Sequence, residues 1–253
     1  ERPIITNSII WHNYPQELYS YDPVGNFEGS FEISYSNIEN GQDSIIVEGS
    51  SGPVWGSGNI DINPMFVDTA NGNYHLLASS MLINAGHPDS TDSDGTRADI
   101  GARPYLNTYS GPIWVVEESG GNDINGTGAE DNKFASIQAA INFASDGDSV
   151  SVWPGTYYEN INFRGRNIKV VGYEWTTGQN PVIDGGANGS VVTFNSGENN
   201  NALLSEFIIQ NGSGIDYENN GSISGGGIFI LQASPTLSNL FFTDNQADRG
   251  SGI

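Results

Sequence analysis

Two nearly alike segments near the opposite ends of this 253-residue chain constrain its fold more than any other feature. The first, PIITNSIIWHN, runs from Pro3 to Asn13, and the second, PTLSNLFFTDN, runs from Pro235 to Asn245. Both follow the pattern P-x-[IL]-[ST]-N-x-[IF]-[IF]-x-x-N. Internal repetition is typical of stacked-repeat folds, in which each repeat buries its apolar face only against a neighbour. We therefore expect a solenoid whose first and last repeats each lack their next repeat.

The rest of the chain alternates short apolar runs with turn residues. Its 33 glycines and many Asn, Asp and Ser residues separate short runs of aliphatic and aromatic side chains. This pattern is typical of many short β-strands joined by tight turns. One segment, residues 133–145, instead carries apolar side chains at three- and four-residue steps and is followed by Gly147. We therefore predict an all-β fold with one short α-helix near 133–145.

The charge balance excludes several classes of partner. The chain has 8 Lys and Arg residues against 30 Asp and Glu residues, which gives a formal net charge of -22. Nucleic acid and anionic membrane surfaces would be repelled, so we expect neither as a partner. No apolar run is long enough to span a bilayer, so we expect no membrane insertion. The absence of cysteine excludes disulfides and thiolate metal sites.

A change in composition divides the chain in its middle. Asn-rich short strands and a Gly/Ser-rich loop precede the change. A strand, a polar Gly-rich loop, the predicted helix and closely spaced short strands follow it. We predict a first domain at residues 1–106, a linker at 107–113 and a second domain at 114–253.

Four segments follow one another in the second domain: FASIQAAI at 134–141, GDSV at 147–150, PGTY at 154–157 and ENI at 159–161. Together they resemble the start of a right-handed parallel β-helix of the pectate-lyase-like superfamily. In that superfamily a helix plugs the N-terminal end of the stack, and the first coil follows it. The resemblance therefore implies that the predicted helix is an N-terminal cap of a β-helix.

Three segments of the first domain carry a second resemblance: NSIIW at 7–11, DINPMF at 61–66 and DGTRADIG at 94–101. They are similar to the closing module of large bacterial surface-associated β-helix repeat proteins. The resemblance implies that residues 1–106 form C-terminal-type β-helix coils and a closing module. It also implies a right-handed parallel β-helix in two parts, with an extracellular or cell-surface location.

The order of the two parts is inverted, because the exit of a β-helix precedes the start of one. Two interpretations stay open. The chain is an excerpt of a tandem array of β-helix domains, or the last coil of one copy stacks on the first coil of the next. An open coil presents unpaired backbone N–H and C=O groups, which template further pairing. A head-to-tail contact of that kind does not close on itself and gives a filament.

A second pair of like segments supports the head-to-tail interpretation. Gly225–Ile228, GGGI, precedes Pro235, and Gly250–Ile253, GSGI, would precede Pro3 of a neighbouring copy. The partner predicted in this way is the chain itself. The residues predicted to form the assembly ends are Pro3, Ile5, Asn7, Ile9, Trp11, Leu237, Asn239, Phe241 and Ile253.

No recognisable catalytic set is present. Glycosidases of this fold use paired carboxylates, and the sequence has no adjacent Asp-Asp pair and no Asn-Thr-Asp run. We therefore assign no catalytic residue. The one cluster of basic residues is Arg164, Arg166 and Lys169, which flank a Gly turn. These side chains are either exposed turn residues or a patch for an acidic sugar.

Two acidic stretches could bind calcium through closely spaced oxygen ligands. The first has the pattern D-x-x-D-x-D-G-x-x-x-D around Gly95, with Asp89, Asp92, Asp94 and Asp99 as ligands. It lacks the bidentate Glu of an EF-hand, so a turn held by side-chain hydrogen bonds is the alternative. The second and weaker candidate contains Asp123 and Asn125. Calcium is the one cofactor predicted.

Two functions follow from these observations. The first is a non-catalytic extracellular structural protein that stacks end to end, as a filament or a tandem array at a cell surface. The second is a carbohydrate-active β-helix domain, either a polysaccharide lyase or hydrolase or a sugar-binding module, with a polysaccharide as partner. The inverted order and matching ends favour the first. The second depends on the family resemblance alone, and fold does not fix function.

Overall fold

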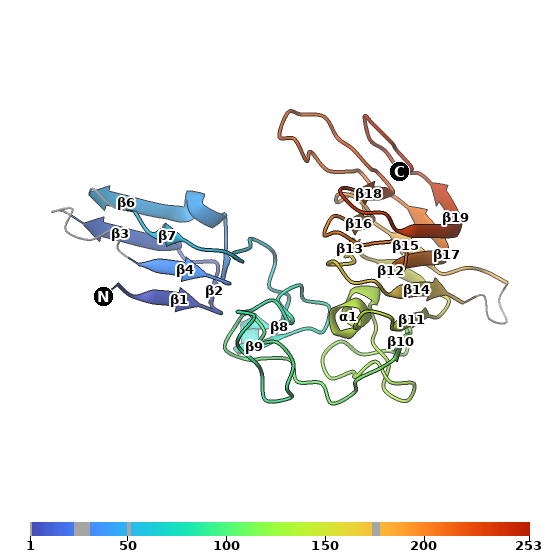
Figure 1. Cartoon of the computed structure of the whole chain (residues 1–253), viewed down its shortest axis with the longest axis horizontal. Helices are drawn as coiled ribbons and strands as arrows, with labels where there is room; N and C mark the ends of the chain where they lie inside the picture. Colours follow the sequence, from blue (N-terminus) through green and yellow to red (C-terminus); the bar gives the residue numbers. More distant parts are fainter. Residues whose placement is uncertain (1, 23–30, 50–51, 174–177) are drawn as a thin grey trace. The chain divides into compact units, whose positions relative to one another are not determined.

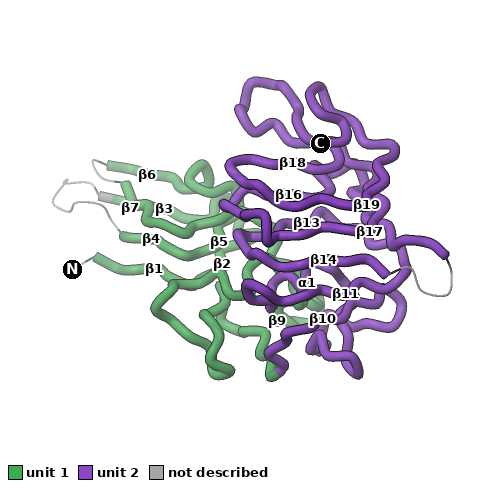
Figure 2. Tube along the Cα trace, turned by 45° about the vertical axis from the view of Figure 1, so that its right-hand side comes forward, with its two compact units in different colours: residues 1–108 green, residues 109–253 purple. Residues whose placement is uncertain are grey.

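The computed structural model describes residues 2–22, 31–49, 52–173 and 178–253. These residues form two compact units, Glu1–Thr108 and Tyr109–Ile253, which Figure 2 colours separately. Within the described residues almost all regular structure is β-strand, and a single α-helix, α1 (Ile137–Phe143), is present. The predicted all-β class with one short helix is confirmed.

The strands of the first unit pair mostly in parallel. Three sets of parallel neighbours occur: β1, β4 and β7 in that order, β2 with β5, and β3 with β6. One antiparallel pair, β8 with β9, lies further along the chain. The elements are β1 (Ile4–Thr6), β2 (Ile9–Ile10), β3 (Leu18–Asp22), β4 (Glu32–Ser34), β5 (Asn37–Ile38), η1 (Gly41–Ser44), β6 (Ile45–Gly49), β7 (Val54–Trp55), β8 (Phe66–Asp68), η2 (Thr69–Asn71) and β9 (Asn73–Leu76).

The core of the first unit is formed by residues that face one another across the parallel pairs. Ile5 lies opposite Ile33, and Ile10 lies opposite Ile38. Ile33 and Ile38 are fully buried and Phe31 is buried beside them, while Ile5 and Ile10 are partly buried and pack against this cluster. Each strand therefore buries its apolar side against the strand beside it.

The second unit contains longer runs of parallel strands. One sheet has the order β10, β11, β14, β17, β15, β12, with β19 also paired to β17, and a second has the order β13, β16, β18. Figure 2 shows the strands of this unit lying one above another. The elements are β10 (Ile113–Val116), β11 (Ser149–Val152), β12 (Thr156–Tyr158), β13 (Ile161–Asn162), β14 (Lys169–Gly172), β15 (Val182–Asp184), β16 (Val192–Phe194), β17 (Leu203–Gln210), β18 (Ile228–Ile230) and β19 (Thr236–Thr243).

The parallel strands β11, β14, β17 and β19 align with one another in register. Ser149 of β11 lies opposite Lys169 of β14, Lys169 lies opposite Leu203 of β17, and Leu203 lies opposite Thr236 of β19. In the same register Val150 lies opposite Val170, Val170 opposite Leu204 and Leu204 opposite Leu237, so apolar side chains stack on one another. The rings of Phe163 and Phe194, both fully buried, have centroids 4.2 Å apart.

Helix α1 is shorter than the predicted 133–145, because its first residues pair with a strand instead. Phe134 N–H donates to Val115 O at 3.1 Å, which extends the sheet rather than the helix. Ser136 is the N-cap, and its hydroxyl accepts from Ala139 N–H. The helix lies beside β10 and β11 in Figure 1 and is buried along most of its length.

Candidate functional site

The two copies of the repeated motif share a backbone conformation. Asn7 and Asn239, the first Asn of each copy, both adopt the left-handed region, with φ of 48° and 51°. Five residues later His12 and Asp244 do the same, with φ of 58° and 54°. Few residues other than glycine adopt this region, so two matching positions indicate the same path of the chain in both copies.

The strands beside each copy repeat the same pair of turns. Tyr35 and Asn40, which stand opposite Asn7 and His12, have φ of 46° and 60°. In the second unit Glu206 and Asn211, opposite Asn239 and Asp244, have φ of 65° and 57°. The motif thus describes one backbone template that is used in both units. The sequence alone could reveal it only where the two copies also agree in residue type.

Strand β1 is an edge strand of the first unit, and its apolar residues are less covered than those of its neighbour. Ile5 and Ile10 are half-buried, whereas the residues opposite them, Ile33 and Ile38, are fully buried. The difference arises because a paired strand covers only one side of the β1–β2 segment. Apolar surface therefore remains exposed at this edge.

Strand β19 is the corresponding edge of the second unit. Leu237 and Phe242 are half-buried, whereas Leu204 and Ile209, which stand opposite them in β17, are fully buried. Phe241 is 63 % exposed. Like β1, this strand presents a partly uncovered apolar row beside an unpaired backbone edge.

The second pair of like segments lies in contact. The N–H groups of Gly225, Gly226, Gly227 and Ile228 donate in turn to the carbonyls of residues 249–252 at 2.8–3.0 Å. Segment Gly250–Ile253 thus lies in parallel beside Gly225–Ile228. Ile253 itself is 55 % exposed.

The remaining predicted assembly residues lie on the first edge. Pro3 O accepts from Glu32 N–H at 2.9 Å, which begins the β1–β4 pairing. Ile9 and Trp11 are half-buried and line a pocket described below. The structure therefore places the nine predicted residues on two edges, one in each unit.

The predicted basic patch is divided between two structural contexts. Arg166 donates from its guanidinium to Ala144 O at 2.9 Å and to Asn142 O at 3.0 Å, so it satisfies carbonyls at the end of α1. Arg164 Nη1 donates to Asn142 Oδ1 at 2.6 Å. Lys169 is exposed and lines a separate pocket of about 550 Å³ with Asn-rich loops. Two of the three cationic side chains thus donate hydrogen bonds to residues at the C-terminal end of α1.

Three of the four predicted calcium ligands in the first stretch accept backbone hydrogen bonds. Asp92 Oδ2 accepts from Asp99 N–H, and Asp94 accepts from Thr96 N–H and Asn107 N–H. Asp99 accepts from Asn84 N–H at 2.7 Å and from Tyr105 N–H at 2.8 Å. Burial raises the pKa of Asp99 to about 7, against the effect of these two donors.

The remaining predicted ligands lie apart from this network. Asp89 N–H donates to His87 Nδ1. Asp123 accepts from Ala135 N–H and Ser136 N–H, and burial raises its pKa, while Asn125 N–H donates to Asn122. Among the described residues, no three His, Asp or Glu side chains are grouped so that they could hold a metal ion. Calcium binding stays a prediction.

Glu159 is a structural carboxylate that sequence reasoning missed. Its two oxygens accept from Ile137 N–H and Gln138 N–H at 2.8 and 2.9 Å, which satisfies donors at the start of α1. Burial raises the pKa of Glu159 to about 7, against the effect of these donors. No local signal predicts this contact, because Glu159 follows the helix by more than one strand.

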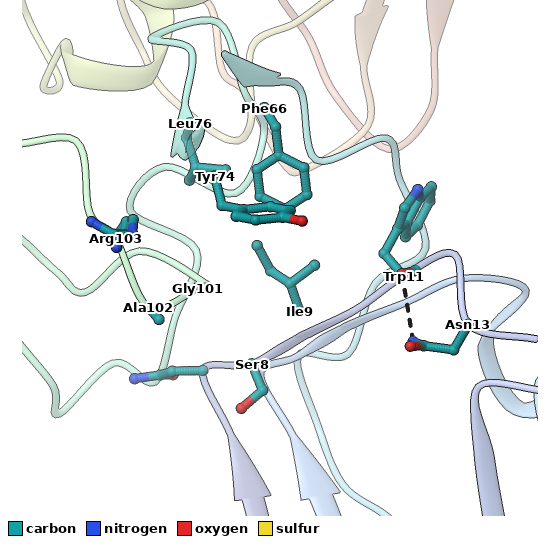
Figure 3. Close-up of a pocket in the computed structure, with 11 residues that line it drawn as sticks. Ser8, Ile9, Trp11, Asn13, Phe66, Tyr74, Leu76, Gly101, Ala102 and Arg103 are labelled. Carbon is teal, nitrogen blue, oxygen red and sulfur yellow. Dashed lines mark hydrogen bonds between the residues drawn. The ribbon is translucent and has the colours of Figure 1, made fainter. Parts of the chain in front are cut away.

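A pocket of about 510 Å³ lies within the first unit (Figure 3). In that view the ring of Tyr74 lies between Phe66 and Ile9, with Trp11 and Arg103 on opposite sides. The rings of Phe66 and Tyr74 pack edge to face, with centroids 5.4 Å apart. The pocket is lined by Asn7, Ser8, Ile9, Trp11, Asn13, Phe66, Tyr74, Leu76, Gly101, Ala102 and Arg103.

No family model, no curated protein and no solved structure matches the chain. The resemblance to the pectate-lyase-like superfamily therefore stays a prediction. In the part of the chain that the structure describes, no helix has the length and hydropathy required to cross a membrane.

Proposed function

We propose that the chain is a non-catalytic structural protein built from two pieces of right-handed parallel β-helix, which stacks head to tail with copies of itself. In this proposal β19 of one copy pairs in parallel with the β1–β2 segment of the next copy. The observation that carries it is the shared backbone template of these two edges, with left-handed residues at Asn7 and His12 and at Asn239 and Asp244. The acidity of the chain and its resemblance to surface-associated β-helix repeat proteins favour an extracellular or cell-surface location.

The template specifies the register of the junction. Alignment of the left-handed residues sets Leu237 against Ile5 and Phe242 against Ile10. These are the partly covered apolar residues of the two edges. The junction would bury them in the way that Leu204 and Ile209 of β17 are buried between neighbouring strands. A register shifted by one residue would turn each apolar row to the other face.

Backbone and charge complementarity support the same register. Thr236 N–H donates inward to Ala202 O, and N–H groups alternate along a strand, so Leu237 N–H points toward the unpaired side. His12, whose side chain is 77 % exposed, would lie opposite Asp244. The His12 imidazole, which lies 3.4 Å from Glu39 within its own unit, would therefore also lie near the Asp244 carboxylate across the junction.

Single-cysteine variants test the proposal, because the chain has no cysteine of its own. Ser238→Cys mixed with Thr6→Cys places one thiol on each edge at the proposed register, and both residues are exposed. Under mild oxidation we expect a disulfide-linked dimer. The matched control replaces Thr6→Cys with Ile4→Cys, which is exposed on the same strand but two residues out of register. Equal cross-linking in both mixtures, or none, contradicts the proposal.

The second candidate is a sugar-binding module in the second unit. Its support is the pocket of about 550 Å³ in which Lys169 is surrounded by Asp146, Asn167 and Asn199–Asn201. Amide-rich pockets suit hydroxyl groups, and the Lys169 ammonium suits an acidic sugar. Binding of a soluble uronate polymer that is lost in Lys169→Ala would favour this candidate. Product formation from that polymer would favour an enzyme over the structural protein.

A further inference from the structure

The pocket in the first unit differs from the rest of this acidic protein, because its lining carries a positive charge and no negative one. The chain carries 30 acidic residues, yet none of the residues that line this pocket is acidic. Its single charged lining residue is Arg103. Arg103 is exposed, and a cation with no acidic residue beside it in the pocket lining favours a negative group there.

The polar groups of the pocket are donors that the protein itself leaves unused. Among the described residues, no hydrogen bond or ion pair engages the guanidinium of Arg103, the indole N–H of Trp11 or the hydroxyl of Tyr74. The side chain of Asn7, another lining residue, accepts from His87 N–H through Oδ1 at 2.7 Å. A ligand rich in acceptors would satisfy these groups.

The apolar walls select the rest of the ligand. Tyr74 is 53 % exposed, and its ring is braced edge to face by Phe66. The exposed part of this aromatic side chain is a contact surface for a flat or ring-shaped group. A volume of about 510 Å³ admits a small molecule and not a folded partner.

We propose that this pocket binds a small carboxylate carried on a ring. The guanidinium of Arg103 pairs with the carboxylate, and the ring of the ligand stacks on Tyr74 (Figure 3). Both an aromatic acid and a sugar acid present this chemistry. Inorganic phosphate lacks a ring, and a nucleic acid would be repelled by the net charge of -22.

Calorimetric titration of the full chain tests the assignment with four probes: 4-hydroxybenzoate, 4-hydroxybenzamide, glucuronate and glucose. We expect at least one acid to bind at least tenfold more tightly than its neutral counterpart. The aromatic pair and the sugar pair identify which ring the pocket accepts. Equal affinity within both pairs, or no binding of either acid at millimolar concentration, overturns the proposal.

Three variants and one control locate the site. Arg103→Ala should weaken the preferred acid at least tenfold, with Arg103→Lys intermediate, and Tyr74→Ala should weaken the acid and its neutral counterpart alike. The control is Arg249→Ala, an exposed arginine of the second unit. Melting curves of each variant show that it is folded. Unchanged binding in folded Arg103→Ala would contradict the assignment of this pocket. The proposed head-to-tail assembly of copies of the chain does not depend on this result.

Discussion

At the scale of single residues, the recurring left-handed positions are the feature that ties the two units together. A non-glycine residue in this region costs roughly 1–2 kcal/mol, so the fold retains it only where the turn requires it. Asn occupies this region at Asn7, Asn40, Asn211 and Asn239. Asn tolerates it because its short amide can form hydrogen bonds locally. The residue type and the turn are therefore consistent with each other.

Asn40 allows a direct test of this cost, because it is exposed and has φ of 60°. We expect Asn40→Gly to leave stability unchanged or slightly higher, since glycine adopts this region freely. Asn40→Val should lower the free energy of unfolding by about 1–2 kcal/mol, because a β-branched side chain is strained there. Chemical denaturation measures both. Equal stability of the two variants would show that this turn does not impose the conformation.

Buried carboxylates give each unit a pH dependence. Burial raises the pKa of Asp99 in the first unit and of Glu159 in the second to about 7. An unfolded carboxyl titrates near pH ~4. The folded state therefore binds these protons more tightly than the unfolded state. Their contribution to stability is fully present below about pH 4 and is lost as the pH rises through 7.

We accordingly expect the melting midpoint of the first unit to decrease as the pH is raised from 5 to 8. In Asp99→Asn this fall should be smaller, because the group that takes up the proton is gone. The comparison concerns the slope with pH, since the substitution also removes one acceptor and lowers stability at every pH. A control, Asp43→Asn, replaces an exposed carboxylate and should keep the wild-type slope. Identical slopes in Asp99→Asn and the wild type would refute the account.

At the scale of elements, local sequence patterns predicted the features that depend on residues close together along the chain. The apolar stripe of residues 133–145 predicted the helix, and the short apolar runs between turn residues predicted many short strands. The helix start was wrong by four residues, because pairing of Phe134 with Val115 competes with helix formation. That pairing depends on a strand about twenty residues earlier, which no local pattern reports.

The candidate sites were less predictable for the same reason. Arg166 read as an exposed turn cation or a sugar ligand, yet its hydrogen bonds go to carbonyls more than twenty residues earlier. No sequence pattern singles out Tyr74 or Arg103, because they are far apart along the chain and line the same pocket only in the folded unit. Contacts of this kind follow from the path of the whole chain.

Stacking of like side chains should supply much of the stability of the second unit. Phe194 is fully buried against Phe163, so Phe194→Ala should lower the free energy of unfolding by about 3–5 kcal/mol. Phe241→Ala is the matched control, because Phe241 is 63 % exposed in the single chain. Chemical denaturation of both variants at low protein concentration measures the difference. Similar losses in the two variants would contradict the packing described here.

At the scale of the whole molecule, the two edges share one template, and each exposes apolar residues that its neighbour buries. Edge strands with unpaired backbone groups favour association unless something covers them. Within the described residues of each unit, no strand pairs with the outer side of β1 or of β19. A heterologous junction between these edges leaves one free edge of each kind on a dimer, so the account predicts further addition of copies into a fibre.

Electron microscopy of the purified chain at increasing concentration tests this claim most directly. The account predicts unbranched fibres with a regular axial repeat of one chain, which shorten or disappear in Thr6→Pro. That substitution removes an N–H group on the outer side of β1, while Thr6→Val retains it and should form fibres as the wild type does. Dispersed single particles of the wild-type chain at every concentration would contradict the account.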